Sequence, residues 1–322
     1  MKIAVTGANG FVGSNFANHF HRLGHEVVAI VRPKSPVDLL DPDVAIRRTD
    51  YQTDLDPALE GVEVLIHNAG AIRTRSFAQM VAANVGATRQ LMEAFNRLET
   101  ARRLVYISSQ AASHPSRSNE EVSEAEPSAP VDWYGRSKLL AERVIRAGCA
   151  KEWVVARPVP VYGPGEKDFL QLYKAVKAGL SFHIGPREQY LNLIYIEELC
   201  LFIELCCTHP QAEGEVFFAS NGKTYTHREF MAACAQALGR KKTLNIAIPI
   251  PLAMAGFYAG ELFETLTGKV TLVNKQKMKE LINVNWVASI AKARELLGWD
   301  PRPDLEANLR KTFAWYREHG WL

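Results

Sequence analysis

Thr6-Gly7-Ala8-Asn9-Gly10-Phe11-Val12-Gly13 follows a short apolar segment, residues 2–5, at the start of the chain. This order predicts a buried strand that passes through a tight turn into a helix. Gly7 is expected to permit the turn, Gly10 to let the backbone approach a pyrophosphate, and Gly13 to let the helix pack closely. The first N–H groups of that helix would face the anion. The stretch therefore predicts a dinucleotide site formed by Gly7, Asn9, Gly10, Phe11, Val12 and Gly13.

The composition is that of an ordinary globular protein and argues against several classes. The chain has 322 residues, 47% hydrophobic and 23% charged, which suits one large α/β domain with a smaller one. A net charge of +3, carried by scattered basic residues, does not predict a nucleic-acid partner. The five cysteines form no Cys-x-x-Cys pair, which predicts reduced thiols in a cytoplasmic protein and no metal site. Met1 leads almost directly into the first expected strand, so we expect no signal peptide.

Short apolar runs alternate with helical patterns along the first half of the chain. This rhythm predicts a parallel sheet with helices on both faces and right-handed crossovers. The expected strands are residues 2–6, 26–31, 44–47, 62–68, 103–108, 153–157 and 191–196. The expected helices are residues 14–23, 55–59, 78–96, 134–147 and 168–178, then 198–207, 227–238, 252–266, 290–297 and 305–319.

The fold class that follows is α/β: a Rossmann-type doubly wound parallel sheet with a smaller, mostly C-terminal α/β substrate domain. We expect residues 1–163 to form the dinucleotide-binding domain. The chain is expected to return to that domain at residues 191–220, through strands at 191–196 and 215–220. Residues 164–190 and 221–322 are expected to bind the substrate.

Two segments leave alternatives open. Residues 243–260 are the most membrane-like part of the chain, but Asn245, Pro249 and Pro251 interrupt them. We expect a strand and then an amphipathic helix over the substrate site, with peripheral membrane contact as the alternative and no integral membrane segment. Residues 114–131 lack an apolar period and form either a solvated connection or a flap near the substrate.

A second informative spacing is Tyr134-Gly135-Arg136-Ser137-Lys138, at the start of an expected helix. Residues four apart share a helix face, so the phenol and the ammonium can belong to one site. A free tyrosine has a pKa of about 10, which a nearby cation lowers toward the range useful for acid–base catalysis. The apolar strand that ends in Ser108-Ser109 would bring hydroxyl groups to the same sheet edge.

Several motifs occur in the order found in one enzyme family. They are Thr6–Gly13, Asn68-Ala69-Gly70, Asn84-Val85-Gly86-Ala87-Thr88, Ser108-Ser109, Tyr134–Lys138, Arg157-Pro158-Val159-Pro160-Val161-Tyr162-Gly163-Pro164-Gly165 and the C-terminal Leu297-Gly298-Trp299-Asp300-Pro301. Over nearly its whole length, the chain resembles an extended short-chain dehydrogenase/reductase of the NAD(P)-dependent epimerase/dehydratase group. The Val31-Arg32-Pro33 stretch resembles the dihydroflavonol-reductase-like and 3-beta-hydroxysteroid-dehydrogenase-like branch.

The resemblance implies a role for each matching residue. Tyr134 would be the general acid/base, Lys138 its partner and a ribose ligand, and Ser109 the residue that orients the substrate oxygen, with Ser108 as the neighbouring candidate. Asn84 would brace the site or only stabilise its helix. Further cofactor contacts are implied for Asp50, Tyr51, Asn68, Ala69, Gly70, Pro158 and Val161. A homodimer through residues 78–96 and 134–147 is also implied.

The end of the second expected strand favours NADP over NAD. An NAD enzyme usually has an acidic residue there, to bind the ribose hydroxyls. This chain has Val31 at that position, followed by Arg32, whose guanidinium can bind a phosphate and stack on adenine. Lys34 and Ser35 can add to the phosphate site.

Three functional hypotheses remain. The first is an NADP(H)-dependent oxidoreductase that interconverts a hydroxyl and a carbonyl group and exchanges its cofactor at every turnover. The second is a nucleotide-sugar epimerase that retains NAD(P). The third, a non-catalytic nucleotide-sensing protein, is disfavoured because Ser109, Tyr134 and Lys138 are all present. Gln110-Ala111 follow Ser109 where dehydratases of the family carry an Asp-Glu pair, which argues against dehydration.

Overall fold

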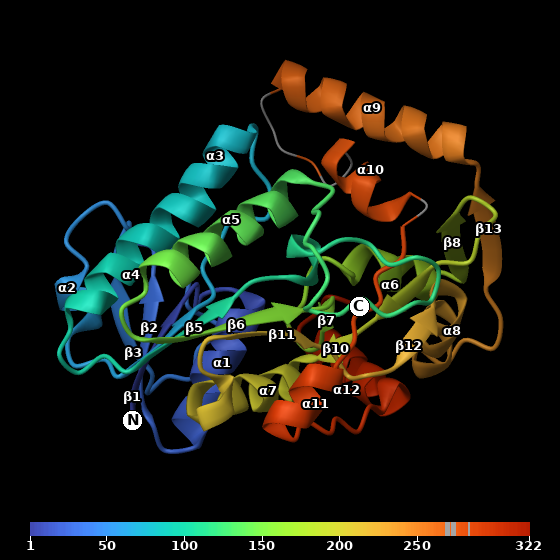
Figure 1. Cartoon of the computed structure of the whole chain (residues 1–322). Helices are drawn as coiled ribbons and strands as arrows, with labels where there is room; N and C mark the ends of the chain where they lie inside the picture. The colour runs from blue at the N-terminus through green and yellow to red at the C-terminus, as the bar shows by residue number, and fades with distance from the viewer. Residues whose placement is uncertain (268–270, 272–274, 283) are drawn as a thin grey trace.

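A parallel seven-stranded sheet organises the molecule in the computed structural model, which describes residues 1–267, 271, 275–282 and 284–322 (Figure 1). The strand order is β11-β6-β5-β4-β1-β2-β3 and every neighbouring pair runs parallel. The strands are β1 (Lys2–Thr6), β2 (Glu26–Val31), β3 (Ala45–Arg48), β4 (Val64–His67), β5 (Arg103–Ile107), β6 (Glu152–Pro158) and β11 (Glu215–Ala219). The predicted Rossmann-type α/β class is confirmed.

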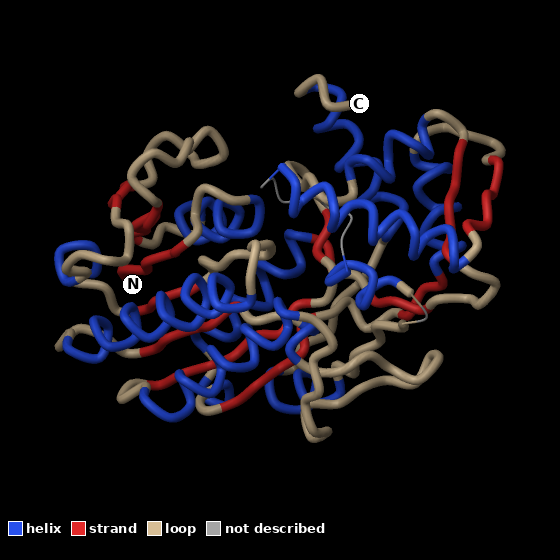
Figure 2. The backbone as a smooth tube through the Cα atoms, turned by 90° about the horizontal axis from the view of Figure 1, so that it is seen from above, coloured by secondary structure: helices blue, strands red, loops and turns tan. Residues whose placement is uncertain are grey.

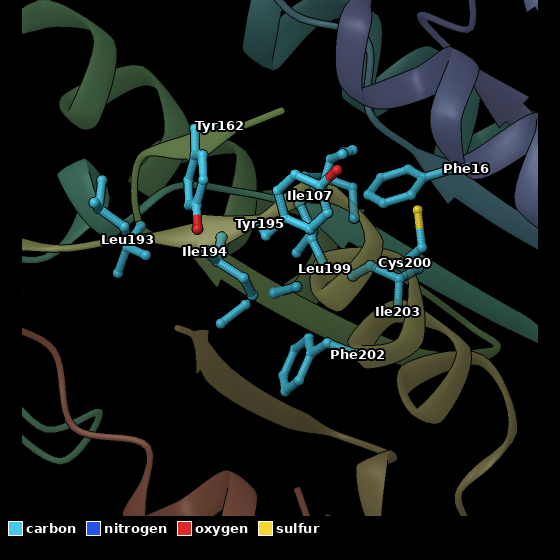
Figure 3. Close-up of a cluster of buried hydrophobic side chains, with 14 of the residues drawn as sticks. Phe16, Ile107, Tyr162, Leu193, Ile194, Tyr195, Leu199, Cys200, Phe202 and Ile203 are labelled. Carbon is cyan, nitrogen blue, oxygen red and sulfur yellow. The ribbon is translucent and has the colours of Figure 1, made fainter. Parts of the chain in front are cut away.

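Helices cover both faces of this sheet because successive residues of each buried strand point to opposite sides. In β1, Ile3 and Val5 belong to one apolar cluster, and Ala4 between them belongs to another. The first cluster includes side chains of α1 (Phe11–Arg22) and α7 (Ile196–Thr208), and part of it is drawn in Figure 3. The second includes α4 (Ala87–Arg97) and α5 (Trp133–Gly148). Figure 1 shows these two pairs of helices on opposite sides of the sheet, and Figure 2 shows its strands side by side from above.

The expected helix at residues 78–96 is divided into three parts. It comprises α3 (Phe77–Val81), a π-helix over Ala82–Gly86 and then α4. A π-helix adds a residue to one turn and is frequent at functional sites. The remaining elements near the sheet are α2 (Asp56–Leu59), a 3-10 helix at Gln110–Ala112 and a 3-10 helix at Pro210–Ala212.

Among the residues that the structure describes, three two-stranded sheets lie outside the main sheet. They pair β7 (Val161–Tyr162) with β10 (Ile194–Tyr195), β9 (Tyr190–Asn192) with β12 (Thr224–Thr226), and β8 (Leu180–Ile184) with β13 (Leu244–Ile248). The predicted return of residues 191–196 to the main sheet is therefore wrong. The apolar period of a short segment does not specify its partner strand, and here β9 and β10 pair locally. The predicted return near residue 215 is confirmed as β11.

Helices follow in the C-terminal half. They are α6 (Leu170–Lys177), α8 (His227–Ala237), α9 (Ile250–Thr267), α10 (Lys275–Leu281), α11 (Ala291–Leu297) and α12 (Leu305–Glu318). Helix α10 and the short strands β7, β8 and β12 were not predicted from the sequence. No helix in the described part of the chain is long and apolar enough to cross a membrane.

The two ambiguous segments have distinct structures. Residues 114–131 form a long loop that is attached to the C-terminal part of the chain by bridges from Ser116 to Asn285 and from Val122 to Ala288. Residues 243–260 contain β13 and the start of α9, as the strand-then-helix interpretation predicts.

Candidate active site

The glycine-rich turn has the geometry that a bound phosphate requires. Gly7 has φ +66°, and a Cβ there would lie 2.9 Å from the Cα of Ala69. A Cβ on Gly13 would lie 2.3 Å from the Gly7 carbonyl oxygen, so helix α1 packs directly on the turn. A Cβ on Gly10 would meet nothing closer than 3.5 Å, and this exposed residue caps α1 without a side-chain hydrogen bond. The helix N-terminus thus fits an anion whose oxygens accept its N–H groups.

The Thr6 hydroxyl fixes the turn that follows β4. It accepts hydrogen bonds from the backbone N–H of Asn68 at 3.1 Å and of Ala69 at 3.0 Å, and lies 2.8 Å from Nδ1 of His67. The Thr88 hydroxyl donates its proton to the Asn84 carbonyl, so its oxygen accepts from Nε2 of His67 at 2.8 Å, and Nδ1 of the neutral ring accepts from Thr6. Burial lowers the pKa of His67 to about 3, so this histidine is a neutral structural residue.

Asn84, in the π-helix, joins the same turn to α5. Its Oδ1 accepts from the N–H of Ala71 at 2.6 Å, and its Nδ2 donates to the Ala71 carbonyl at 2.9 Å and to the Ser137 hydroxyl at 2.8 Å. A Cβ on Gly70 would lie 3.2 Å from Asn84 Oδ1 and 3.3 Å from the Nζ of Lys138. Asn84 therefore braces the turn after β4 against α5, and its predicted role at an active site stays a prediction.

Lys138 is a buried cation at the centre of the site. It is 3% exposed and its Nζ donates to the Ile107 carbonyl, at the end of β5, at 2.8 Å. The Nζ lies 5.9 Å from the ring centroid of Tyr134, one helical turn earlier, and 4.9 Å from that of Tyr106. Burial lowers the pKa of Lys138 to about 8, and the nearby carboxylate of Glu142 opposes this shift. The lysine therefore remains mostly protonated at neutral pH.

The two adjacent serines have different partners. Ser108 is buried and its hydroxyl donates to Glu142, whose carboxylate forms a buried ion pair with Arg157 at 2.7 Å. Ser109 is half-buried and its hydroxyl accepts from the Ala111 N–H at 3.2 Å, at the start of the 3-10 helix. Ser109 is therefore the serine whose hydroxyl proton is not used by Glu142.

A glycine that the sequence analysis did not single out brings Tyr134 toward Ser109. A Cβ on Gly135 would lie 2.0 Å from the carbonyl oxygen of Ala111, so the first turn of α5 packs against the 3-10 helix with no side chain between them. Asp132 caps α5 and accepts from the Gly135 N–H at 2.7 Å. Only a glycine permits this approach. The sequence signal for it was Gly135 itself, the second residue of the Tyr134–Lys138 motif.

The residues predicted to select NADP lie on an exposed loop after β2. Val31 is buried, while Arg32 and Lys34 are exposed. The sequence analysis missed Arg48, whose Nη1 donates to the carbonyl oxygens of Arg32, Pro33 and Ser35 at 3.1, 3.0 and 3.1 Å. Arg48 thereby fixes the shape of the loop that carries both cationic side chains.

Asp50 and Tyr51 follow β3 and have unequal surroundings. The Asp50 side chain is exposed, and its Oδ1 accepts from the N–H groups of Gln52 at 2.9 Å and of Thr53 at 3.2 Å, hydrogen bonds that lower its pKa. Tyr51 has φ 64° and is buried near Thr6, Gly7 and Arg32. Burial raises the pKa of Tyr51 to about 12. Tyr51 thus lies between the glycine-rich turn and the loop after β2.

The last predicted cofactor residues border the same region. Pro158 ends β6 and is buried, and Val161 is half-buried in β7. Asn9, Phe11 and Val12 are also half-buried. Gly165 has φ +89°, and a Cβ there would lie 3.8 Å from Cδ2 of Phe11, so the loop that contains Gly165 packs next to the Phe11 ring. All these residues follow the carboxyl ends of the parallel strands, where ligands of such sheets bind.

Comparison with known proteins agrees with this architecture. The model of the NAD dependent epimerase/dehydratase family matches residues 3–219. The chain is similar to a ceramide reductase of Caulobacter vibrioides, with 27% identity over 99% of this chain and 96% of the relative. It is also similar to a 2-alkyl-3-oxoalkanoate reductase of Stenotrophomonas maltophilia, with 28% identity over 98% of this chain and 99% of the relative.

Among solved structures, the fold is shared with a UDP-glucuronic acid 4-epimerase from Bacillus cereus in complex with UDP-glucuronic acid and NAD. The TM-score is 0.78 at 21% identity, over 99% of this chain and 100% of that one. At this identity the similarity concerns the fold alone.

Proposed function

The chain belongs to the NAD-dependent epimerase/dehydratase family, and from this premise we propose that it interconverts a hydroxyl and a carbonyl group on an apolar organic substrate with NADP(H). The observation that carries the proposal is the placement of Lys138. Its buried ammonium holds the end of β5, which continues into Ser109, and lies one helical turn from Tyr134. Three groups suited to acid–base chemistry on one oxygen atom are thus tied to one sheet edge.

The proposed roles follow from the chemistry of each side chain. The cofactor supplies or accepts the hydride at the substrate carbon. In the reductive direction, the Tyr134 hydroxyl gives its proton to the substrate oxygen as the carbonyl becomes an alcohol, and oxidation reverses this transfer. The Lys138 cation stabilises the phenolate that remains and holds the ribose hydroxyls. The Ser109 hydroxyl donates a hydrogen bond to the same substrate oxygen and orients it.

The proposed preference for NADP rests on charge at the end of β2. Val31 offers no carboxylate to the ribose hydroxyls, and Arg32 and Lys34 offer two exposed cations beside that position. A guanidinium binds a phosphate through two parallel hydrogen bonds. Arg48 contributes by holding the loop through three backbone carbonyl oxygens, without contact to the nucleotide.

The apolar nature of the substrate is supported by the relatives that align over the whole chain. The names of the ceramide reductase and of the 2-alkyl-3-oxoalkanoate reductase each specify a substrate that has alkyl chains and a carbonyl or hydroxyl group. We assign cofactor binding to residues 1–163 and most of the substrate contacts to residues 164–190 and 221–322. A second activity, epimerisation of a nucleotide sugar, remains the competing hypothesis because the fold is shared with such enzymes.

The test is turnover of NADPH and NADH, measured by nicotinamide absorbance, on a panel of long-chain 3-oxo compounds. We expect NADPH-dependent reduction by the wild type, which Tyr134→Phe lowers by a factor of about 100 or more. Arg32→Ala is expected to raise the KM for NADPH about tenfold or more and to leave that for NADH unchanged. Arg48→Ala should also raise the KM for NADPH and leave kcat unchanged, because Arg48 only holds the loop that carries Arg32 and Lys34.

Two outcomes would contradict the proposal. Equal use of both nucleotides by the wild type and by Arg32→Ala would remove the argument for NADP. Epimerisation of a UDP-sugar without net nucleotide turnover would replace the oxidoreductase with the competing activity. Arg102→Ala, at an exposed arginine before the amino end of β5 and so opposite the edge where ligands of such sheets bind, is the control for loss of a surface cation.

A further inference from the structure

Helix α9 presents an apolar face to solvent. Leu252, Leu262, Phe263 and Leu266 are 64%, 59%, 49% and 76% exposed. With the exposed Ala255 and Ala259, the three leucines follow the helical spacing of one face over the whole length of α9. We call this face, formed by Leu252, Ala255, Ala259, Leu262, Phe263 and Leu266, the outer stripe. Figure 1 shows α9 at the edge of the molecule, above α10 and away from the main sheet.

The two acidic side chains of α9 point the other way. Glu261 forms an ion pair with Lys275, at the start of α10, at 2.6 Å. Glu264 accepts a hydrogen bond from the Thr271 hydroxyl at 3.0 Å. Phe257, one turn before Glu261, is buried. Both acidic groups of the helix are therefore bound by this chain itself, whereas the apolar residues of the outer stripe face solvent, the reverse of an ordinary surface helix.

The segment of the sequence that carries the outer stripe is positively charged. Residues 241–282 contain six lysines and three glutamates, a net charge of +3 that equals the net charge of the whole chain. An apolar helix face within a lysine-rich segment is the pattern of a helix that lies along an anionic membrane surface. A second copy of the chain is the poorer fit, because a two-fold pairing of α9 would bring two such lysine-rich segments together.

We propose that the outer stripe of α9 binds the surface of an anionic phospholipid bilayer, with the helix parallel to the membrane plane. The same region reaches the site. Gln276 of α10 accepts a hydrogen bond from the backbone N–H of Trp133 at 3.2 Å, next to Tyr134, and α10 also holds Glu261 of α9 through Lys275. Resting on the proposed function, this surface would bring an apolar, membrane-dissolved substrate to Tyr134.

The experiment is flotation of the purified full-length protein with phosphatidylcholine vesicles, with and without phosphatidylglycerol. We expect binding to the anionic vesicles, weakened by salt, and at least a tenfold loss of it in the double variant L262E/L266E. L201E, which places the same charge on an exposed leucine of α7, is the matched control and should bind as the wild type does. Thermal denaturation checks that the double variant is folded.

Each other outcome would overturn the proposal. Absence of vesicle binding by the wild type would do so directly, as would equal loss in L201E and L262E/L266E. If gel filtration with light scattering shows a dimer that L262E/L266E dissociates, and vesicles do not bind, the stripe is an interface between copies. Tyr134→Phe should float with the vesicles as the wild type does. Flotation therefore tests the membrane proposal even if the proposed enzymatic function is wrong.

Discussion

Ser108 and Ser109 are neighbours in sequence, but the fold gives them different tasks. The Ser108 hydroxyl donates to Glu142 beside the buried Arg157 ion pair, whereas Ser109 begins the 3-10 helix at the sheet edge. We predict that Ser109→Ala lowers kcat about 100-fold and lowers the free energy of unfolding by about 1 kcal/mol or less, because one cap hydrogen bond of a short 3-10 helix is lost. Ser108→Ala should instead lower the free energy of unfolding by about 1 to 3 kcal/mol, because a hydrogen bond to a buried carboxylate is lost.

Enzyme kinetics and chemical denaturation of the two variants separate these roles. The reverse pattern, with kcat lost in Ser108→Ala and stability lost in Ser109→Ala, would assign the substrate contact to the other serine.

Lys138 is a cation held in the protein interior at a cost to stability. Burial lowers its pKa from 10.5 to about 8, so between these values the unfolded chain binds more protons than the folded one. This group's contribution to stability therefore rises with pH between about 8 and 10.5 and is most unfavourable below 8. We predict that Lys138→Met loses activity but gains roughly 1 to 3 kcal/mol of stability at neutral pH.

Urea denaturation across pH measures this effect. The advantage of Lys138→Met over the wild type should shrink as pH rises through about 8. A variant that is less stable than the wild type at every pH would show that the hydrogen bond to the Ile107 carbonyl outweighs the burial of the charge.

At the scale of one element, different glycines of the glycine-rich turn serve stability and cofactor binding. A Cβ at position 13 would lie 2.3 Å from the Gly7 carbonyl oxygen, whereas one at position 10 meets nothing closer than 3.5 Å. Gly13→Ala is therefore predicted to destabilise the protein by about 3 kcal/mol or more. Gly10→Ala should change stability by no more than about 1 kcal/mol and weaken NADPH binding at least tenfold, because the methyl group occupies the phosphate position.

Thermal denaturation and fluorescence titration with NADPH check both halves. Tight NADPH binding by a stable Gly10→Ala variant would show that this glycine does not approach the diphosphate. Retained stability in Gly13→Ala would mean that the turn relaxes around the added methyl group.

The elements that the sequence predicted are those whose signal is local. The strands of the main sheet and the helix after Gly10 follow from apolar period and glycine spacing. Arg48 was missed because binding to three carbonyl oxygens of a distant loop leaves no pattern in the chain. The pairing of residues 191–196 with the main sheet was also predicted wrongly, because a short apolar run carries no information on which strand it pairs with. The sequence left open whether the apolar residues of α9 cover the substrate site or contact a membrane, because the orientation of a helix depends on what it packs against.

At the scale of the whole molecule, α5 connects the parts of the site. Its first turn packs on the 3-10 helix through Gly135, and its side chains bind β5 through Lys138, β6 through Glu142 and the π-helix through Ser137. These partners are far apart in sequence. The sequence motifs named most of the candidate residues, but only the folded chain shows how one helix fixes their positions.

The whole molecule also bears on whether the cofactor leaves between turnovers. Arg73 on the loop after β4 joins Asp168, before α6, through an ion pair of 2.8 Å with side chains 36% and 59% exposed. Such a pair contributes about 0 to 1 kcal/mol and adds little to the attachment of one loop to the other. From this weak link and from the exposed cations Arg32 and Lys34, we predict a cofactor that exchanges. Protein purified without added nucleotide and then denatured should release little nucleotide, or a partial amount of NADP(H), as chromatography against standards measures. Near-stoichiometric NAD(H) would contradict both the role of Arg32 and the exchanging oxidoreductase, since an epimerase re-reduces its intermediate with the nucleotide that it retains.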